Sequence, residues 1–179
     1  MRALRTIASL TITLGLAGCA HEERPTPAPS SLAQTARPRS QAPAASAAAF
    51  VSINGSIDLF VIRSSELALQ RSSSARIRDF ATQMIRAHKG TSAQLSFAGR
   101  RLNLLPSATL RPAEEAMFES LQSTPGFDAE YVRDQRAVHQ QAVALDRTYA
   151  ASGRSPTLRP IAAAALPIEQ RHLRMIADL

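Results

Sequence analysis

The stretch that decides the fold is residues 75–101, ARIRDFATQMIRAHKGTSAQLSFAGRR. Its apolar positions recur every three, four or seven residues, the spacing that places side chains on one face of an α-helix. The stripe consists of Ile77, Phe80, Ala81, Met84, His88 and Leu95. Ser74 precedes the stretch and is a residue type that caps helices. We therefore predict a long amphipathic helix from about Ala75 to Arg101, with a histidine on its apolar face.

The same periodicity continues from about Phe50 to the C-terminus, in segments separated by turn residues. We expect further long helices over about 50–71 and 128–152 and from Pro156 onward, with a short helix beginning at Pro112. The serines at 72–74, the Ser-Thr-Pro-Gly turn at 123–126 and Gly153 separate them. No stretch alternates with period two for long enough to predict a strand. Four long helices with short connections predict an all-α, up-down-up-down four-helix bundle over residues 50–179, with the short helix as a crossing piece.

Residues 1–18 have the parts of a secretory signal peptide: a basic start, a short apolar run and small residues at the end. The apolar run is far shorter than the ~20 residues of a membrane-spanning helix. Leu16-Ala17-Gly18-Cys19 resembles the lipobox of bacterial lipoproteins. We expect cleavage before Cys19 and attachment of diacylglycerol and a further acyl chain such as palmitate. The alternative is an ordinary cleaved signal peptide in which Cys19 has no role.

Cys19 is the only cysteine, so no internal disulfide is possible. Two or three acyl chains on it would hold the protein on membrane lipid without a spanning helix. Ala20 follows in place of Asp, which favours the outer membrane of a two-membrane cell. We predict a periplasmic, lipid-anchored envelope protein, in which residues 19–49, rich in Pro, Ala and Ser, form a disordered tether.

The formal net charge of +7 is weak evidence for a nucleic-acid partner. Almost every basic residue is Arg, and Lys89 is the only Lys. Together with abundant Ala, this is the composition that a GC-rich genome produces. The basic residues are scattered and few aromatic residues are present to stack on bases, so we predict no nucleic-acid binding. A loose attraction to anionic lipid is more compatible with this composition, because Arg pairs well with phosphate.

Several short motifs in fixed order resemble those of a bacterial family known as domain of unknown function 4142. They are Phe80-Ala-Thr-Gln-Met84-Ile-Arg-Ala-His88, Phe127-Asp128-x-x-Tyr131, His139, and Leu166-Pro167-x-x-x-x-His172-Leu173. The resemblance covers residues 50–179. It implies a ferritin-like bundle in a protein described as an outer membrane protein, with no settled activity. Members often have an acidic residue where this sequence has Ala87, which weakens any transfer of a charged site.

Three histidines are expected to share one level of the bundle. In the assumed helix order, His88 and His139 each lie roughly 20 Å from the end where the first and last helix pairs turn, and His172 roughly 24 Å. Asp58 and Glu169 fall near the same level. Glu169 and His172 also form a Glu-x-x-His pair, the spacing with which bundle metal sites direct two side chains inward. The candidate ligands of a divalent metal are therefore Asp58, His88, His139, Glu169 and His172.

The pattern leaves three interpretations of this level open. A di-iron carboxylate site needs two Glu-x-x-His pairs, but Ile85 and Arg136 occupy the positions three before His88 and His139. A metal, if bound, would be zinc or copper on histidine ligands. The histidines could instead form a structural hydrogen-bond network, or an acid–base or pH-sensing group.

No nucleophile or phosphate-binding motif is present, so the sequence favours a protein that is not an enzyme. Three functions remain open. The first is a non-enzymatic envelope lipoprotein that binds an unknown envelope protein or contributes to stress tolerance. The second is a metal-binding or redox protein with a degenerate His/carboxylate site. The third is a hydrolytic or other enzyme that uses His88, His139 or His172.

Overall fold

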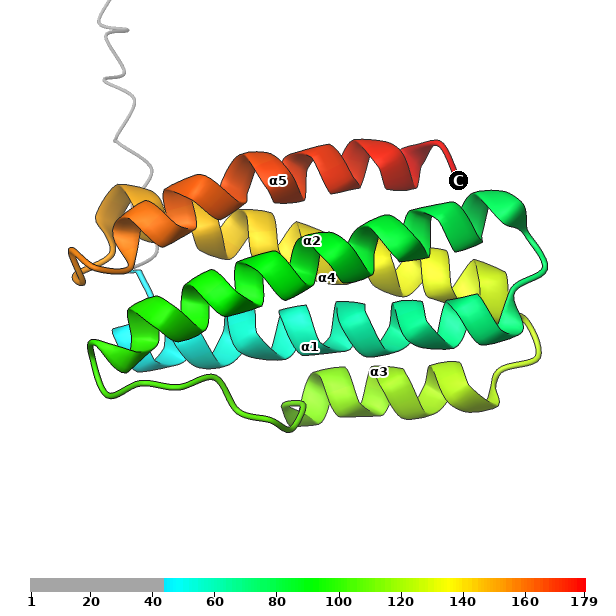
Figure 1. Ribbon diagram of the computed structural model, residues 1–179, viewed down its shortest axis with the longest axis horizontal. Coiled ribbons are helices and arrows are strands. Elements are labelled where there is room, and N and C mark those ends of the chain that lie inside the picture. The colour runs from blue at the N-terminus through cyan, green and yellow to red at the C-terminus, as the bar shows by residue number, and fades with distance from the viewer. Residues whose placement is uncertain (1–43) are drawn as a thin grey trace, which may run out of the picture. The chain divides into compact units, whose positions relative to one another are not determined.

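The computed structural model describes residues 44–179 (Figure 1). This range contains five helices and no strand. The helices are α1 (Ala47–Arg71), α2 (Ala75–Arg100), α3 (Pro112–Ser123), α4 (Phe127–Ser152) and α5 (Arg159–Ala177). The predicted all-α class, with four long helices and one short helix, is confirmed. The predicted signal peptide, Cys19 and most of the predicted tether lie outside the described residues.

Local side-chain chemistry explains where two of the helices begin. The first helix was expected from Phe50, but α1 begins at Ala47, inside the last residues of the predicted tether. Ser46 caps it, because its side chain accepts a hydrogen bond from the Ala49 amide at 3.1 Å, and the alanines that follow have high helix propensity. The last helix was expected from Pro156. It begins at Arg159 because the residues before it form a turn closed by the Ser155 side chain.

The four long helices run side by side, and each is antiparallel to both of its neighbours (Figure 1). α1 and α5 each lie between α2 and α4, while α3 packs along α1 and α4. Cross-helix contacts fix the directions: Ser65 of α1 meets Tyr131 near the start of α4, and Arg76 of α2 meets Asp178 just after α5. In chain order the long helices therefore run up, down, down, up, rather than in the strict alternation expected. The reason is α3, which carries the chain back along the bundle so that α4 starts at the same end as α2.

The apolar core falls into two clusters on either side of a polar layer. The larger includes Phe60, Phe80 and Tyr131, near the turn between α1 and α2. The smaller, which includes Phe50 and Tyr149, lies toward the other end. Between them, near the middle of the long helices, the buried residues are polar and include the three histidines. The bundle therefore buries polar groups at mid-length, and such burial is costly unless the groups are hydrogen-bonded or paired.

Among the described helices, α1 alone is long and apolar enough to cross a membrane by length and composition. Half of the residues in the most apolar part of this helix are buried inside the bundle. Packing against α2, α3 and α4 therefore accounts for its apolar character.

Candidate metal centre

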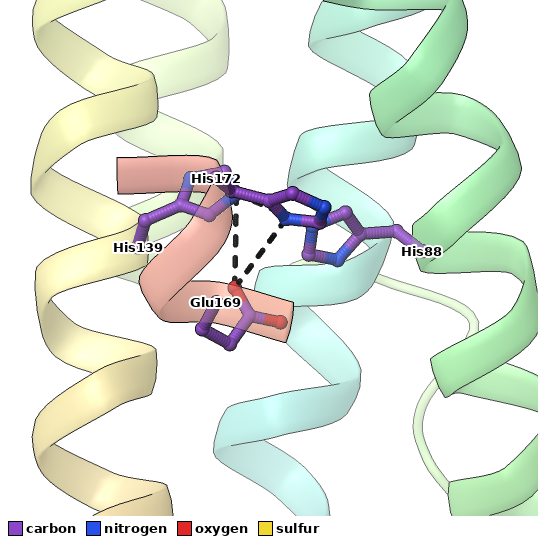
Figure 2. A group of neighbouring side chains, drawn as sticks. All are labelled: His88, His139, Glu169 and His172. Atoms are coloured by element: carbon purple, nitrogen blue, oxygen red, sulfur yellow. Dashed lines mark hydrogen bonds and ion pairs between the residues drawn. The ribbon is translucent and has the colours of Figure 1, made fainter. Parts of the chain in front are cut away.

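Four buried side chains from three helices converge in the polar layer (Figure 2). His88 comes from α2, His139 from α4, and Glu169 and His172 from α5. One potential ligand atom from each lies within 4.8 Å of the other three. The imidazole ring centroids are 5.2–5.3 Å apart in all three pairs. We call these four residues the His/Glu cluster.

The orientation of His88 is fixed by a carboxylate on α1. Nδ1 of His88 lies 2.8 Å from Oδ1 of Asp58, and the Thr91 hydroxyl donates to the same oxygen at 2.8 Å. A carboxylate can only accept, so Nδ1 of His88 carries a proton and donates it. The other ring nitrogen, Nε2, then points into the cluster. A carboxylate behind a histidine is the arrangement that orients metal-binding imidazoles.

His139 is held in the same way by its own helix. Its Nδ1 lies 2.6 Å from the backbone carbonyl oxygen of Gln135, which also can only accept. The Nε2 atoms of His88 and His139 are 3.3 Å apart. When both rings are neutral, two lone pairs face each other across this distance and no hydrogen bond joins them. A proton or a metal cation between the two atoms is needed to make the contact favourable.

Glu169 and His172 complete the cluster from one face of α5, three residues apart. Oε2 of Glu169 lies 3.7 Å from Nε2 of His139 and 4.0 Å from Nδ1 of His172 (Figure 2). Both distances are too long for hydrogen bonds. Oε2 of Glu169 and Nδ1 of His172 are buried and have no hydrogen-bond partner among the described residues. Two ligand-type atoms thus face the cluster centre unpaired.

Of the three histidines in the cluster, His88 is the one whose positively charged form is favoured. Burial lowers the pKa of His88, but the hydrogen bond with Asp58 and the neighbouring carboxylates outweigh burial, so the pKa of His88 is raised. Burial and the nearby His88 hold the pKa of His139 well below its usual value and lower the pKa of His172 to about 3. Burial raises the pKa of Glu169 to about 7. His139 and His172 are therefore neutral at pH 7, the form that binds metals, and their contacts with Glu169 are not ion pairs.

Residues 32–179 match the family described as domain of unknown function (DUF4142). The chain belongs to this family. The match confirms the resemblance drawn from the motifs, and it begins within the segment predicted to be a tether. No curated protein matches the chain in sequence.

Solved structures of two other proteins share the fold. CopM in its Cu(II)-bound form superposes with a TM-score of 0.64 at 15% identity, covering 75% of this chain and 95% of that chain. CopM in its Cu(I)-bound form gives 0.63 at 14% identity, with 75% and 94% covered. A DUF305 fragment from Deinococcus radiodurans gives 0.64 at 19% identity, with 76% and 97% covered. At these identities the similarity shows a common helical bundle.

A small polar cavity adjoins the cluster on the side of the smaller apolar cluster. Its volume is about 20 Å³, room for about one water molecule. Its walls include Asp58 and Glu169 and two further polar side chains, Asn54 and Asp146. Asn54 donates to Oδ1 of Asp146 at 3.0 Å, whereas Oδ2 of Asp146 is buried without a partner. Burial and the neighbouring carboxylates raise the pKa of Asp146 to about 7 despite that hydrogen bond.

All five candidate ligands lie in the polar layer, but they occupy two kinds of position. His88, His139, Glu169 and His172 form the cluster, whereas Asp58 lies behind His88 and contacts its outer nitrogen. Their role as ligands stays a prediction.

Four further residues surround the cluster and were not predicted from the sequence: Asn54, Thr91, Gln135 and Asp146. Asp146 follows His139 by seven residues and Thr91 follows His88 by three, so helical spacing alone could have found both. The Gln135 carbonyl carries no sequence signal, because every residue has one.

Proposed function

We propose that the His/Glu cluster binds a single copper ion and that the domain is a copper-binding protein. The supporting observation is the convergence of one ligand-type atom from each of the four cluster residues within 4.8 Å, with Nε2 of His88 and Nε2 of His139 only 3.3 Å apart. Strong acceptors hold both Nδ1 atoms, so the rings cannot turn to relieve the contact without losing a buried hydrogen bond. A cation bound between them takes the place of the proton that otherwise joins the two nitrogens.

The cluster fits four-coordinate binding with small movements. Metal–nitrogen bonds of ~2.0–2.1 Å in a tetrahedral site place ligand atoms about 3.3–3.4 Å apart. The His88–His139 separation of 3.3 Å already matches, and the contacts of 3.7 and 4.0 Å to Glu169 are slightly long. The widest pair, at 4.8 Å or less, must contract on binding. Side-chain rotation of Glu169 and His172 can supply this, because neither of the atoms involved is fixed by a hydrogen bond.

Copper is the metal that this donor set favours. Three imidazoles and one carboxylate suit copper or zinc, and copper(II) stands above zinc in the general order of affinity for such ligands. Binding of copper(II) would draw the four ligands from the tetrahedral toward the tetragonal arrangement that this ion prefers. The similarity in fold to CopM, whose structures hold Cu(I) and Cu(II), supports the same choice. A di-iron centre is not favoured, because Ile85 and Arg136 stand where it needs carboxylates.

The test is a copper titration of the purified protein carrying Cys19→Ser, since the only thiol would otherwise compete for the metal. We expect one tightly bound copper per chain and a rise in the unfolding free energy by ~2.7 kcal/mol at a free copper concentration of 100 Kd. His139→Ala should abolish both effects. His21→Ala removes the one histidine outside the cluster and serves as the matched control. Equal copper binding by His139→Ala and the parent protein would overturn the proposal, as would parent protein that binds no copper.

We also propose that the domain works at the periplasmic face of the outer membrane, anchored by acylated Cys19. The support is the order of basic start, short apolar run and Leu-Ala-Gly-Cys at residues 2–19. In that compartment a copper-binding domain would contribute to tolerance of metal stress, alone or with an envelope protein partner. Palmitate labelling and membrane fractionation of the wild type and of Cys19→Ser test the anchor. An unlabelled wild-type protein recovered in the soluble fraction would remove it.

A further inference from the structure

A surface groove between α2 and α5 reaches one member of the His/Glu cluster, His172. Its volume is about 530 Å³, and His172 forms part of its wall. The other wall residues include two methionines and two arginines. They are Met84, Arg86, Arg171 and Met175.

Helix register places both methionines at one level, a single turn away from the histidines. Met84 precedes His88 by four residues on α2, and Met175 follows His172 by three residues on α5. α2 and α5 are antiparallel, as the contact between Arg76 and the backbone after α5 requires. Both steps therefore lead toward the same end of the bundle, by about one helical turn of ~5.4 Å. Met84 is buried and Met175 is half-buried, so the pair extends from the groove surface inward.

The methionines of the domain are concentrated at this groove. The chain has four, of which Met1 lies outside the described residues and Met117 lies on α3, outside the groove walls. Thioether sulfur is a soft, neutral ligand that selects Cu(I) over the hard divalent ions. The exposed Arg86 and Arg171 disfavour hydrated divalent cations in the groove more strongly than a singly charged ion. Ligand type and charge therefore both favour Cu(I) at this level.

We propose that Met84 and Met175 form an auxiliary thioether site that takes Cu(I) from the groove and passes it to the His/Glu cluster through His172. The inference rests on the proposed function, because it supplies the route by which the cluster is loaded. The metal keeps its oxidation state along this route, and each step exchanges one ligand for another. The two sites then differ in role: the thioethers set the rate of loading, and the histidines set the affinity.

The test is the rate at which Cu(I) moves from its bicinchoninate complex to the protein under anaerobic conditions, followed by the loss of the complex's absorbance. All proteins carry Cys19→Ser. The double variant Met84→Leu/Met175→Leu conserves side-chain volume, so the fold should be kept, and circular dichroism checks this. We expect loading by one equivalent of Cu(I) to slow by about tenfold, the equivalent of ~1.4 kcal/mol on the barrier, with unchanged final occupancy. Met117→Leu changes a half-buried methionine outside the groove and should load at the parental rate.

X-ray absorption gives a second, independent readout. With two equivalents of Cu(I), the parent protein should show sulfur scattering from copper, and the double variant should lose it. Loading of the double variant at the parental rate, or an equal slowing by Met117→Leu, would show that the methionines only pack, and would overturn the inference. A fall in final occupancy at one equivalent would make the thioethers ligands of the main site, which also overturns it. Failure of the proposed function looks different, because the parent protein then takes up no Cu(I) or His139→Ala takes up as much.

Discussion

Asp58→Asn tests whether the carboxylate behind His88 prepares the cluster for metal. Asp58 Oδ1 accepts from Nδ1 of His88 at 2.8 Å, in a place where the histidine side chain is fully buried and the aspartate side chain is 8% exposed. Asparagine keeps the size of the side chain but removes its charge. Its amide can also turn its NH₂ group toward Nδ1, which would move the ring proton to Nε2, the atom that must bind the metal.

Two magnitudes bound the expected effect. A hydrogen bond to a charged group contributes ~1.5–3 kcal/mol. Loss of a carboxylate behind a metal-binding histidine typically weakens metal binding by about 10–100-fold, which is ~1.4–2.7 kcal/mol. The buried geometry at Asp58 places the effect toward the upper end of this range, because little water reaches the pair to screen it. We expect copper affinity to fall by about 30–100-fold.

The assay is competition for copper against a chelator of known affinity, with Asp134→Asn as the matched control. Asp134 is a buried carboxylate on α4 that makes no contact with the cluster, so the same chemical change there should leave copper affinity unchanged. Thr91→Val removes the second donor to Asp58 Oδ1 and should have a smaller effect than Asp58→Asn. Copper affinity of Asp58→Asn equal to that of the Asp134→Asn control would refute the role assigned to this carboxylate.

Three further predictions concern the metal-free fold. Burial raises the pKa of Asp134 to about 6, so the folded state binds the proton of Asp134 more tightly than the unfolded state does. The folded state therefore loses stability as pH rises from about 4 to 6. Asp134→Asn should raise the free energy of unfolding by roughly 1 kcal/mol at pH 7.5, and a gain as large at pH 4 would contradict this. Ser65→Ala leaves the buried Tyr131 hydroxyl unpaired and should cost ~1–3 kcal/mol in urea denaturation; adding Tyr131→Phe should cost little more, and additive losses would argue against the hydrogen bond. Gly90→Ala should stabilise α2 by ~0.5–1 kcal/mol, because nothing lies within 4 Å of the new Cβ. Gly55→Ala should destabilise, because its Cβ would lie 2.6 Å from a proline Cβ, and equal melting temperatures for the two glycine variants would refute the comparison.

Periodicity predicted the helices well because each has a buried stripe that survives in the structure. The stripe of α2 is buried throughout, including His88, and Ser74 caps the helix through the Ile77 amide as its position suggested. The direction of α4 could not be predicted in this way. It depends on whether the chain between α2 and α4 crosses the bundle, and that is decided by how α3 packs on α1 and α4.

The three histidines lie at one level of the bundle, as expected, although the helix directions assumed for that prediction differ from those in the structure. Distances along the first and last helix pairs were measured from turns assumed to lie at one end, whereas these turns lie at opposite ends (Figure 1). The level survives because His88 and His139 both lie near the middle of 26-residue helices, so the choice of end changes little. The hydrogen bonds of the histidines could not be predicted from the sequence, because the tautomer of each imidazole depends on which acceptor the ring contacts. The Gln135 carbonyl and Asp58 become those acceptors only after the helices pack.

The distribution of unpaired polar atoms argues that the polar layer is completed by a cation rather than by the protein. Near the α1–α2 turn, Ser65 and Tyr131 bond to each other at 2.8 Å, so this buried pair is closed within the chain. In the polar layer, by contrast, some buried polar atoms have no partner. Among the described residues, seven buried side-chain atoms have no partner, and two of them, on Glu169 and His172, face the cluster. The others belong to Arg111, Asp134, Gln135, Asp146 and Tyr149.

Two more atoms, Nε2 of His88 and Nε2 of His139, meet only each other. An unsatisfied buried polar group costs ~1–3 kcal/mol, so a set of this size is a substantial burden for a small domain. A purely structural network would be expected to reduce that burden, as Asp58, Thr91 and Gln135 do on the outer side of the rings. Here the outer nitrogens of His88 and His139 are satisfied, whereas their inner nitrogens share at most one proton, which is the arrangement of a site that can receive a positive ion.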